Sequence, residues 1–251
     1  MIEIRKLHKS FHGTPVLNDV NLTVASGSVT AVVGESGCGK TVLLKCIMGL
    51  MRVEAGTILV DGEEVTAMDS RTLYQLRKRF GMLFQSSALF DFMTVSENVS
   101  LPLITHTQYP DDAIRKRVRE MLDAVGLKDG HEKMPAELSG GMKKRVGLAR
   151  ALILEPVYML YDEPTAGLDP VRSHAINQLI VETQKRRRIT SIVVTHDIQS
   201  AFMVSNRIAM LHEGIIIFEG TPKEMMQCPE HKVRQFVRLA MMQRMPALEN
   251  A

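Results

Sequence analysis

The sequence has no tryptophan, and aromatic residues make up only 5% of its 251 positions. It also has no long hydrophobic run, because the longest one, Val157–Tyr161, is far shorter than the roughly 18 apolar residues of a membrane-spanning helix. Charged residues interrupt the apolar positions near the start, so we expect no signal peptide. We therefore do not expect an integral membrane protein.

Cysteine is scarce as well, with three residues standing far apart, Cys38, Cys46 and Cys228. An odd number at this spacing matches neither a disulfide framework nor a zinc site, and it favours a reducing cytosol. Neither sign of charge is in large excess, since the sequence has 31 Lys and Arg residues and 28 Asp and Glu residues. So small an excess argues against a nucleic-acid partner. The 45% of hydrophobic residues is typical of a globular protein, and a length of 251 residues corresponds to one large α/β domain or two small ones.

Hydrophobic patterning predicts a β/α core that a helical segment interrupts. Strands are expected where apolar residues alternate or form short runs, at 1–7, 16–24, 29–33, 57–60, 80–84, 157–161, 191–194, 207–211 and 215–219. Helices are expected at 40–50 and 111–125, the second one ending at Gly126. We therefore predict a core of residues 1–85 and 156–227, a helical subdomain of residues 86–155, and a helical tail of residues 228–251.

A glycine-rich loop follows the predicted strand 29–33 and precedes a predicted helix. Its sequence, Gly34-Glu-Ser-Gly-Cys-Gly-Lys-Thr41, fits the pattern G-x-x-x-x-G-K-[ST] without a mismatch. Backbone N–H groups of such a loop surround a phosphate, the lysine reaches the β- and γ-phosphates, and the hydroxyl binds Mg²⁺. The predicted nucleotide-binding residues are Gly34, Glu35, Ser36, Gly37, Cys38, Gly39, Lys40 and Thr41.

Two carboxylates end another apolar strand and supply the second part of a nucleotide site. Asp162 and Glu163 directly follow the run 157–161. We expect Asp162 to hold Mg²⁺ through water, and Glu163 to orient and deprotonate the attacking water. Two carboxylates can simply be solvated at the end of a strand, but the phosphate loop upstream favours the catalytic interpretation.

The segment Leu138-Ser-Gly-Gly-Met142 lies ahead of these carboxylates and resembles the signature motif of the ATP-binding cassette (ABC) ATPases. Further positions are similar to motifs of the same family, in the same order along the chain: Phe11, Gln85, the segment Ala166–Asp169, and His196. The resemblance covers residues 1–225. It implies a P-loop NTPase of the ABC type: an α/β fold with a mixed sheet, N-terminal antiparallel strands and an inserted helical subdomain.

The resemblance also implies roles for these residues. Phe11 would stack on adenine, Gln85 would contact Mg²⁺ or water and sense a membrane partner, and His196 would bond the γ-phosphate. Ser139 and Gly141 would face a γ-phosphate on a second copy, so that two chains sandwich two MgATP. Each role has a plainer alternative: a core position for Phe11, a surface strand end for Gln85, and a structural histidine for His196.

Two further segments narrow the resemblance. Gln85–Asn98 and Met142–Gly147 resemble the ATPases of bacterial phospholipid-trafficking (Mla-type) systems. That resemblance implies ATP-driven phospholipid transport that maintains outer-membrane lipid asymmetry, by a homodimer at the cytoplasmic face of the inner membrane. Its partners would be a permease contacting the region around Gln85, a small STAS-like regulatory subunit and a periplasmic lipid-binding component. The ATPase of a solute importer or of a cell-division complex remains an alternative.

Two features lie outside these motifs. The basic segments Lys143–Arg145 and Lys185–Arg188 are interpreted as solvated helix faces.

A tail helix from about His231 places one set of apolar residues on a single face: Val233, Phe236, Val237, Ala240 and Met241. That face can pack on its own domain, dock on a second subunit or a regulatory partner, or lie on lipid, and the sequence leaves these three open.

Overall fold

The computed structural model describes residues 1–242, so the predicted tail residues 243–251 lie outside the described part. The chain divides into two compact units, here called unit 1 (Met1–Tyr74 with Thr190–Ala251) and unit 2 (Gln75–Ile189). In the described residues, no helix is long and apolar enough to cross a membrane. The division into a core of residues 1–85 and 156–227 and a helical subdomain of residues 86–155 remains a prediction.

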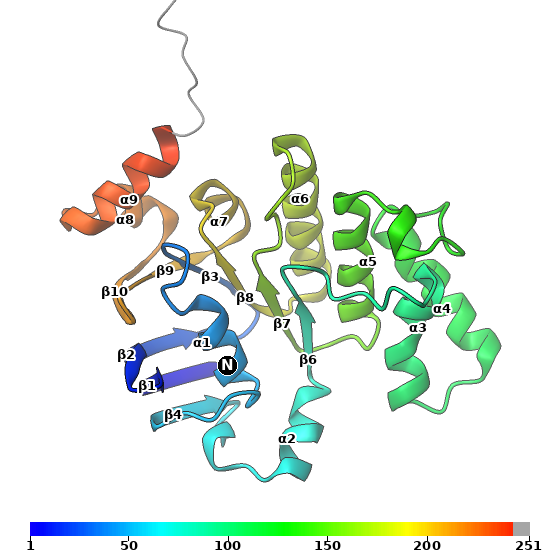
Figure 1. The fold of residues 1–251 in the computed structure, drawn as a ribbon, viewed down its shortest axis with the longest axis horizontal. Coiled ribbons are helices and arrows are strands. Elements are labelled where there is room, and N and C mark those ends of the chain that lie inside the picture. Colours follow the sequence, from blue (N-terminus) through cyan, green and yellow to red (C-terminus); the bar gives the residue numbers. More distant parts are fainter. Residues whose placement is uncertain (243–251) are drawn as a thin grey trace, which may run out of the picture. The chain divides into compact units, whose positions relative to one another are not determined.

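The N-terminal part of unit 1 is an antiparallel sheet in the order β2-β1-β4-β5. Strands β2, β1 and β4 lie side by side in Figure 1. The bounds are β1 (Ile2–Phe11), β2 (Thr14–Val24), β4 (Ala55–Val60) and β5 (Glu63–Glu64). Alternation buries Ile2 and Ile4. A register shift between Ile4 and Leu7, with a left-handed backbone at Lys6, then returns Leu7 to the core.

The other strands of unit 1 follow one another in the order β10-β9-β3-β8. They are β3 (Val29–Val33), β8 (Thr190–Thr195), β9 (Arg207–His212) and β10 (Ile215–Gly220). Strand β3 runs parallel to β8 and β9, and all of its residues are buried, as the continuous apolar run predicts. The pair β9–β10 is a hairpin whose turn residues, Glu213 and Gly214, both have positive φ.

Helices of unit 1 follow its strands in the chain: α1 (Lys40–Ile47), α7 (Ile198–Val204), α8 (Pro222–Met226) and α9 (His231–Met242). Helix α2 (Ser70–Arg77) crosses the boundary between the units in sequence, and a short 3₁₀ turn, η1, spans Val65–Ala67. The predicted helix at 40–50 ends earlier than expected, at Ile47, because Gly49 adopts a left-handed conformation that terminates helices.

Unit 2 combines a parallel strand pair with helices. Strand β6 (Phe80–Leu83) pairs with β7 (Tyr158–Asp162). The helical elements are α3 (Val95–His106), α4 (Asp111–Ala124), the 3₁₀ turn η2 (Pro135–Glu137), α5 (Gly140–Leu152) and α6 (Pro170–Arg187). The predicted helix at 111–125 is confirmed: acidic residues open it, and it buries Ile114, Val118, Met121 and Leu122.

Helix α9, the red helix in Figure 1, packs on its own unit. Val233 is fully buried in a cluster with Ile198, Ala201 and Met210, and three further residues of α9 pack against that cluster: Phe236, Val237 and Ala240. Packing within the domain, the first of the three alternatives, is therefore confirmed. Met241, the last residue of the predicted apolar face, is exposed.

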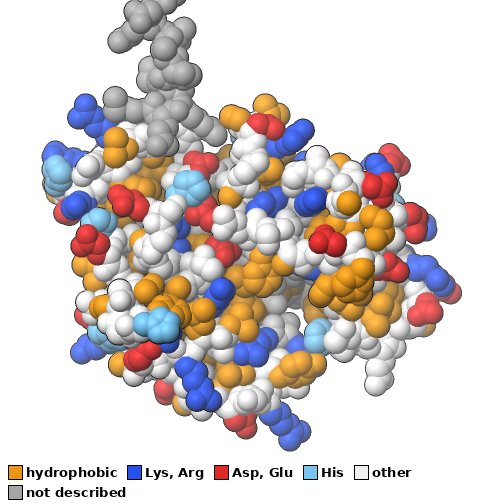
Figure 2. Space-filling model, in the orientation of Figure 1, with side chains coloured by type: hydrophobic (Ala, Val, Ile, Leu, Met, Phe, Trp, Pro, Cys, Tyr) orange, Lys and Arg blue, Asp and Glu red, His pale blue; other side chains and the backbone are white. Residues whose placement is uncertain are grey.

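The surface carries both signs of charge. On the face drawn in Figure 2, Lys and Arg side chains are interspersed with Asp and Glu side chains. This mixture agrees with the small net charge of +3.

Candidate nucleotide-binding site

The glycine-rich loop of unit 1 joins the end of β3 to the start of α1, as predicted. A β-carbon at Gly34 would lie 2.2 Å from the carbonyl oxygen of Leu211, so only glycine fits there. Gly39 has φ 107°, and a β-carbon there would lie 2.9 Å from a methyl carbon of Leu17. These two glycines let the backbone make the tight turn that a phosphate-binding loop requires.

The side chain of Lys40 turns back into this loop. Its ammonium donates hydrogen bonds to the carbonyl oxygens of Gly34 at 2.9 Å and Glu35 at 2.8 Å. The residue is buried, whereas Glu35 and Ser36 on the rim are exposed. Thr41 lies in the first turn of α1 and is half-buried. The loop therefore presents a buried cation to a rim that solvent reaches.

Cys38 also belongs to the loop, and its sulfur lies 3.9 Å from the Lys40 ammonium. Burial raises the pKa of the Cys38 thiol, and the neighbouring Lys40 charge opposes this only in part. The thiol is therefore protonated at neutral pH.

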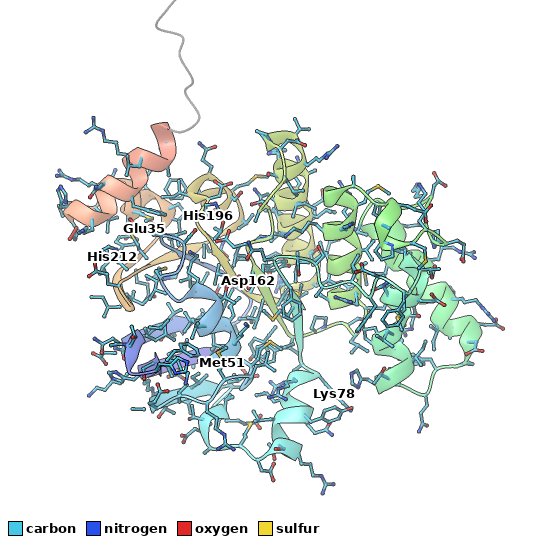
Figure 3. The ribbon with its side chains drawn as sticks, viewed as in Figure 1. Glu35, Met51, Lys78, Asp162, His196 and His212 are labelled. Carbon is cyan, nitrogen blue, oxygen red and sulfur yellow. The ribbon has the colours of Figure 1, made fainter. Side chains whose placement is uncertain are left out.

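Two further predicted residues lie in unit 1. Phe11 ends β1 with 40% of its surface exposed, and the Lys9 ammonium stands 5.1 Å from the centre of its ring. This exposure rules out the core alternative and suits a ring that stacks on a ligand. His196, labelled in Figure 3, directly follows β8 and is exposed. The next residue is Asp197, whose carboxylate caps α7.

The two carboxylates lie in unit 2: Asp162 is the last residue of β7 (Figure 3), and Glu163 follows it in the chain. Asp162 and Glu163 are both buried. Glu163 has φ 47°, a left-handed conformation that costs energy in a residue other than glycine. Such strain often marks a functional position, because the surrounding structure must hold the residue in place.

Lys144 is the residue that the sequence-based interpretation missed. It is 4% exposed, so the expectation that Lys143–Arg145 forms a solvated face is wrong for this residue. Its ammonium donates to the carbonyl oxygens of Gln85 at 2.6 Å and Glu163 at 3.1 Å. The available signal was helical spacing, since Lys144 lies three residues after Gly141 and four before Leu148, both buried. Arg145 is likewise bonded, to the carbonyl oxygen of Val125.

The signature segment forms the start of α5. Ser139 caps this helix by accepting a hydrogen bond from the backbone N–H of Met142, and it is exposed. Gly141 lies in the first turn and is buried. The segment Ala166–Asp169 has a similar role for α6, where the Asp169 carboxylate accepts from the Arg172 N–H.

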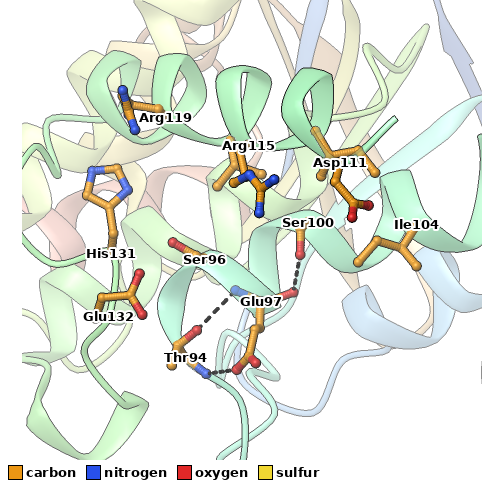
Figure 4. Close-up of a pocket in the computed structure, with 12 residues that line it drawn as sticks. Thr94, Ser96, Glu97, Ser100, Ile104, Asp111, Arg115, Arg119, His131 and Glu132 are labelled. Atoms are coloured by element: carbon orange, nitrogen blue, oxygen red, sulfur yellow. Dashed lines mark hydrogen bonds between the residues drawn. The ribbon is translucent and has the colours of Figure 1, made fainter. Parts of the chain in front are cut away.

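The structure thus brings together Gln85, Lys144 and Glu163 within unit 2, and the loop residues Gly34–Thr41 within unit 1. A cavity of about 430 Å³ lies elsewhere in unit 2, between α3 and α4 (Figure 4). Its lining includes Glu97, Arg115 and His131, and none of the predicted site residues. The predicted site is therefore separate from this cavity.

Comparisons with known proteins agree with the motifs. The ABC transporter family profile matches residues 17–166. The Mycobacterium tuberculosis protein named "Probable ribonucleotide transport ATP-binding protein mkl" is 42% identical over 236 residues, which span 94% of this chain but only 66% of that relative. The "Intermembrane phospholipid transport system ATP-binding protein MlaF" of Haemophilus influenzae is 40% identical over 238 residues, 95% of this chain and 90% of the relative.

A solved structure is similar over nearly its whole length. It is a dimeric ATP-binding cassette in a post-hydrolysis state bound to ADP and Pi, with 31% sequence identity and a TM-score of 0.82. The match covers 88% of this chain and 99% of that one.

Proposed function

This chain belongs to the ABC transporter family as an ABC-type ATPase, and on that premise we propose that it is the motor subunit of a bacterial phospholipid transporter. ATP binding and hydrolysis would drive phospholipid movement across the envelope and maintain outer-membrane lipid asymmetry. The observation that carries the proposal is the phosphate loop, in which a buried Lys40 ammonium is held by loop carbonyl groups. The similarity to MlaF over 95% of the chain supports the substrate class.

ATP and Mg²⁺ fit the chemistry of the residues present. The loop Gly34–Thr41 supplies N–H groups and an ammonium for the phosphates, and Phe11 supplies an exposed ring for adenine. Thr41, Gln85 and Asp162 carry the hydroxyl, amide and carboxylate oxygens that Mg²⁺ prefers. Bound Mg²⁺ would neutralise charge that develops on the β- and γ-phosphates.

Each remaining residue has one task in hydrolysis. The Glu163 carboxylate accepts a proton from the attacking water, and the His196 imidazole donates to a γ-phosphate oxygen. Ser139 and Gly141 face the γ-phosphate held by a second copy, so that the active form is a homodimer. The dimeric state of the similar cassette supports this arrangement. In this scheme residues 1–85 and 156–227 form the nucleotide-binding core, and residues 86–155 form the helical subdomain.

The same proposal implies a set of partners. An integral-membrane permease would contact the region around Gln85, where Phe92 exposes 76% of its surface. A STAS-like regulatory subunit and a periplasmic lipid-binding component would complete the system. The ATPase itself would lie at the cytoplasmic face of the inner membrane, as a peripheral subunit.

Ribonucleotide transport is the second candidate, because the name of the mycobacterial relative states it and that relative is 42% identical. Phospholipid transport is favoured because the match spans 90% of MlaF but 66% of Mkl. The test is to isolate the complex from native membranes, place it in liposomes with a fluorescent phospholipid, and follow both ATP hydrolysis and lipid transfer.

Transfer that needs ATP and is lost in a Lys40→Ala complex supports the phospholipid assignment, since that variant lacks the loop cation. Hydrolysis that responds to ribonucleotides and leaves the lipid in place would favour the second candidate. ATP hydrolysis unaffected by Lys40→Ala would contradict the assignment of the loop itself.

A further inference from the structure

Lys144 occupies a central position in unit 2. It lies in the second turn of α5, the helix that begins at the signature residues, and only 4% of it is exposed. Its two hydrogen bonds reach the carbonyl oxygen of Gln85, just beyond β6, and that of Glu163, just beyond β7. One side chain therefore joins the signature helix to the ends of two neighbouring parallel strands.

The charge of Lys144 is costly to bury. Burial lowers the pKa of its ammonium, while the carboxylates of Asp162 and Glu163 favour the charged form. An apolar side chain of similar size fills such a position at equal or lower cost, so stability alone does not account for a buried cation. The ammonium instead supplies directional donors, which an apolar side chain lacks.

The two acceptors, the carbonyl oxygens of Gln85 and Glu163, belong to or adjoin backbone in a strained conformation. Glu163 has φ 47°, and two residues close after Gln85 also have positive φ, Ser87 at 64° and Ala88 at 46°. Such conformations persist where surrounding contacts determine them. The carbonyl bonds from Lys144 fix the peptide at Glu163 and the start of the strained segment at Gln85. Helix α5 holds that segment a second time, because Arg150 donates to the Ser87 carbonyl oxygen at 2.9 Å.

We propose that Lys144 is a positioning residue for ATP hydrolysis, which fixes the backbone of Gln85 and Glu163 so that the Glu163 carboxylate meets the attacking water. It acts through Glu163 and touches neither nucleotide nor water. This rests on the proposed role of Glu163 as general base. A carboxylate that shifts by a fraction of an ångström loses rate without losing nucleotide affinity, because the phosphate loop binds the nucleotide separately.

The test compares three variants of the full chain in its complex with the native permease. Lys144→Met keeps length and removes the donors, Lys144→Arg keeps charge and donors, and Lys143→Met removes a charge from the neighbouring, half-buried position. We expect Lys144→Met to lower kcat about 30-fold, with KM and the Kd for a non-hydrolysable ATP analogue within about twofold of wild type. Lys144→Arg should recover to within about fivefold of the wild-type kcat, and Lys143→Met should match wild type.

Other results would overturn the proposal. A wild-type kcat in Lys144→Met, an equal loss of kcat and nucleotide affinity, or a Lys144→Arg no better than Lys144→Met each contradicts positioning. If Lys144→Met does not fold, Lys144→Gln replaces it; its shorter amide is expected to lower kcat about fivefold at unchanged Kd, and an unchanged kcat overturns the proposal. An inactive wild-type complex, or an active Lys40→Ala complex, would instead show that the proposed function is wrong.

Discussion

Asn98 holds Phe90 by both of its backbone groups: its Oδ1 accepts from the Phe90 N–H at 2.9 Å, and its Nδ2 donates to the Phe90 carbonyl at 3.1 Å. The same Nδ2 donates to the carbonyl oxygens of Met93 and Thr94. This fully buried amide therefore fixes the loop from Phe90 to Thr94. Within that loop, Phe92 exposes most of its side chain, so an apolar ring stands on the surface of a segment that Asn98 holds in place.

Phe92→Ala is expected to weaken association with the permease. The side chain is 76% exposed and its ring lies beside that of Phe90, with 5.7 Å between ring centres, so its removal should change the melting temperature by no more than about 2 °C. An aromatic ring buried at an interface contributes on the order of 2 kcal/mol, which corresponds to roughly a 30-fold weaker Kd. The measurement is titration of the detergent-solubilised permease with the purified ATPase. An unchanged Kd would place the permease contact elsewhere.

Asn98→Ala provides the matched comparison for the same loop. It removes the acceptor of the Phe90 N–H and the side-chain donor to the Met93 carbonyl oxygen, whereas the carbonyl oxygens of Phe90 and Thr94 keep backbone N–H donors. We therefore expect it to lower the free energy of unfolding by about 2 kcal/mol as well as to weaken permease binding. Loss of stability without loss of binding would show that the loop conformation is irrelevant to the partner.

Glu163→Gln is expected to slow hydrolysis while ATP stays bound, because the amide keeps size and hydrogen bonding but cannot accept a proton. With MgATP, the variant should accumulate as a dimer in analytical ultracentrifugation, and turnover should fall by about two orders of magnitude. The same sample with ADP serves as the control and should be monomeric. A monomer with normal turnover in MgATP would remove Glu163 from the role of base.

The sequence is sufficient for some of these features and insufficient for others, for identifiable reasons. Strand β3 is found at its predicted bounds, Val29–Val33, since a short apolar run before a glycine-rich loop has few other interpretations. The role of Lys144 was not predicted, because its hydrogen-bond partners lie 59 and 19 residues away in the chain. The local sequence does not indicate that its ammonium will meet a carbonyl oxygen. The positive φ of Glu163 likewise depends on tertiary contacts.

Helix α9 shows the same limit of prediction from sequence. Helical spacing identified the apolar face of α9, with Val233 at its centre. An amphipathic pattern states that a face is buried but not against which surface, so packing on α7 became evident only in the structure.

Cys46 predicts a specific pH dependence of stability. Burial raises the pKa of its thiol from 9.0 to about 11. Between these values the folded chain keeps the proton and the unfolded chain releases it, so the free energy of unfolding falls as pH rises, by at most about 1.4 kcal/mol per pH unit. Urea unfolding across this range should show that Cys46→Ala lacks this component of the slope. Parallel curves for the two proteins would contradict the raised pKa.

Val233→Ala measures how much the packing of α9 on its own unit contributes to stability. The side chain is fully buried among residues of its own unit, so truncation leaves a small cavity and should cost about 2 kcal/mol. In a chain of this size that corresponds to a melting temperature lower by roughly 4–8 °C. The matched control is Leu239→Ala on the same helix, which is 54% exposed and should change the melting temperature by no more than about 2 °C. If Val233→Ala instead melts like the wild type and weakens only the MgATP-dependent dimer, the apolar face of α9 serves the second subunit, because an interface residue affects assembly and leaves the isolated chain intact.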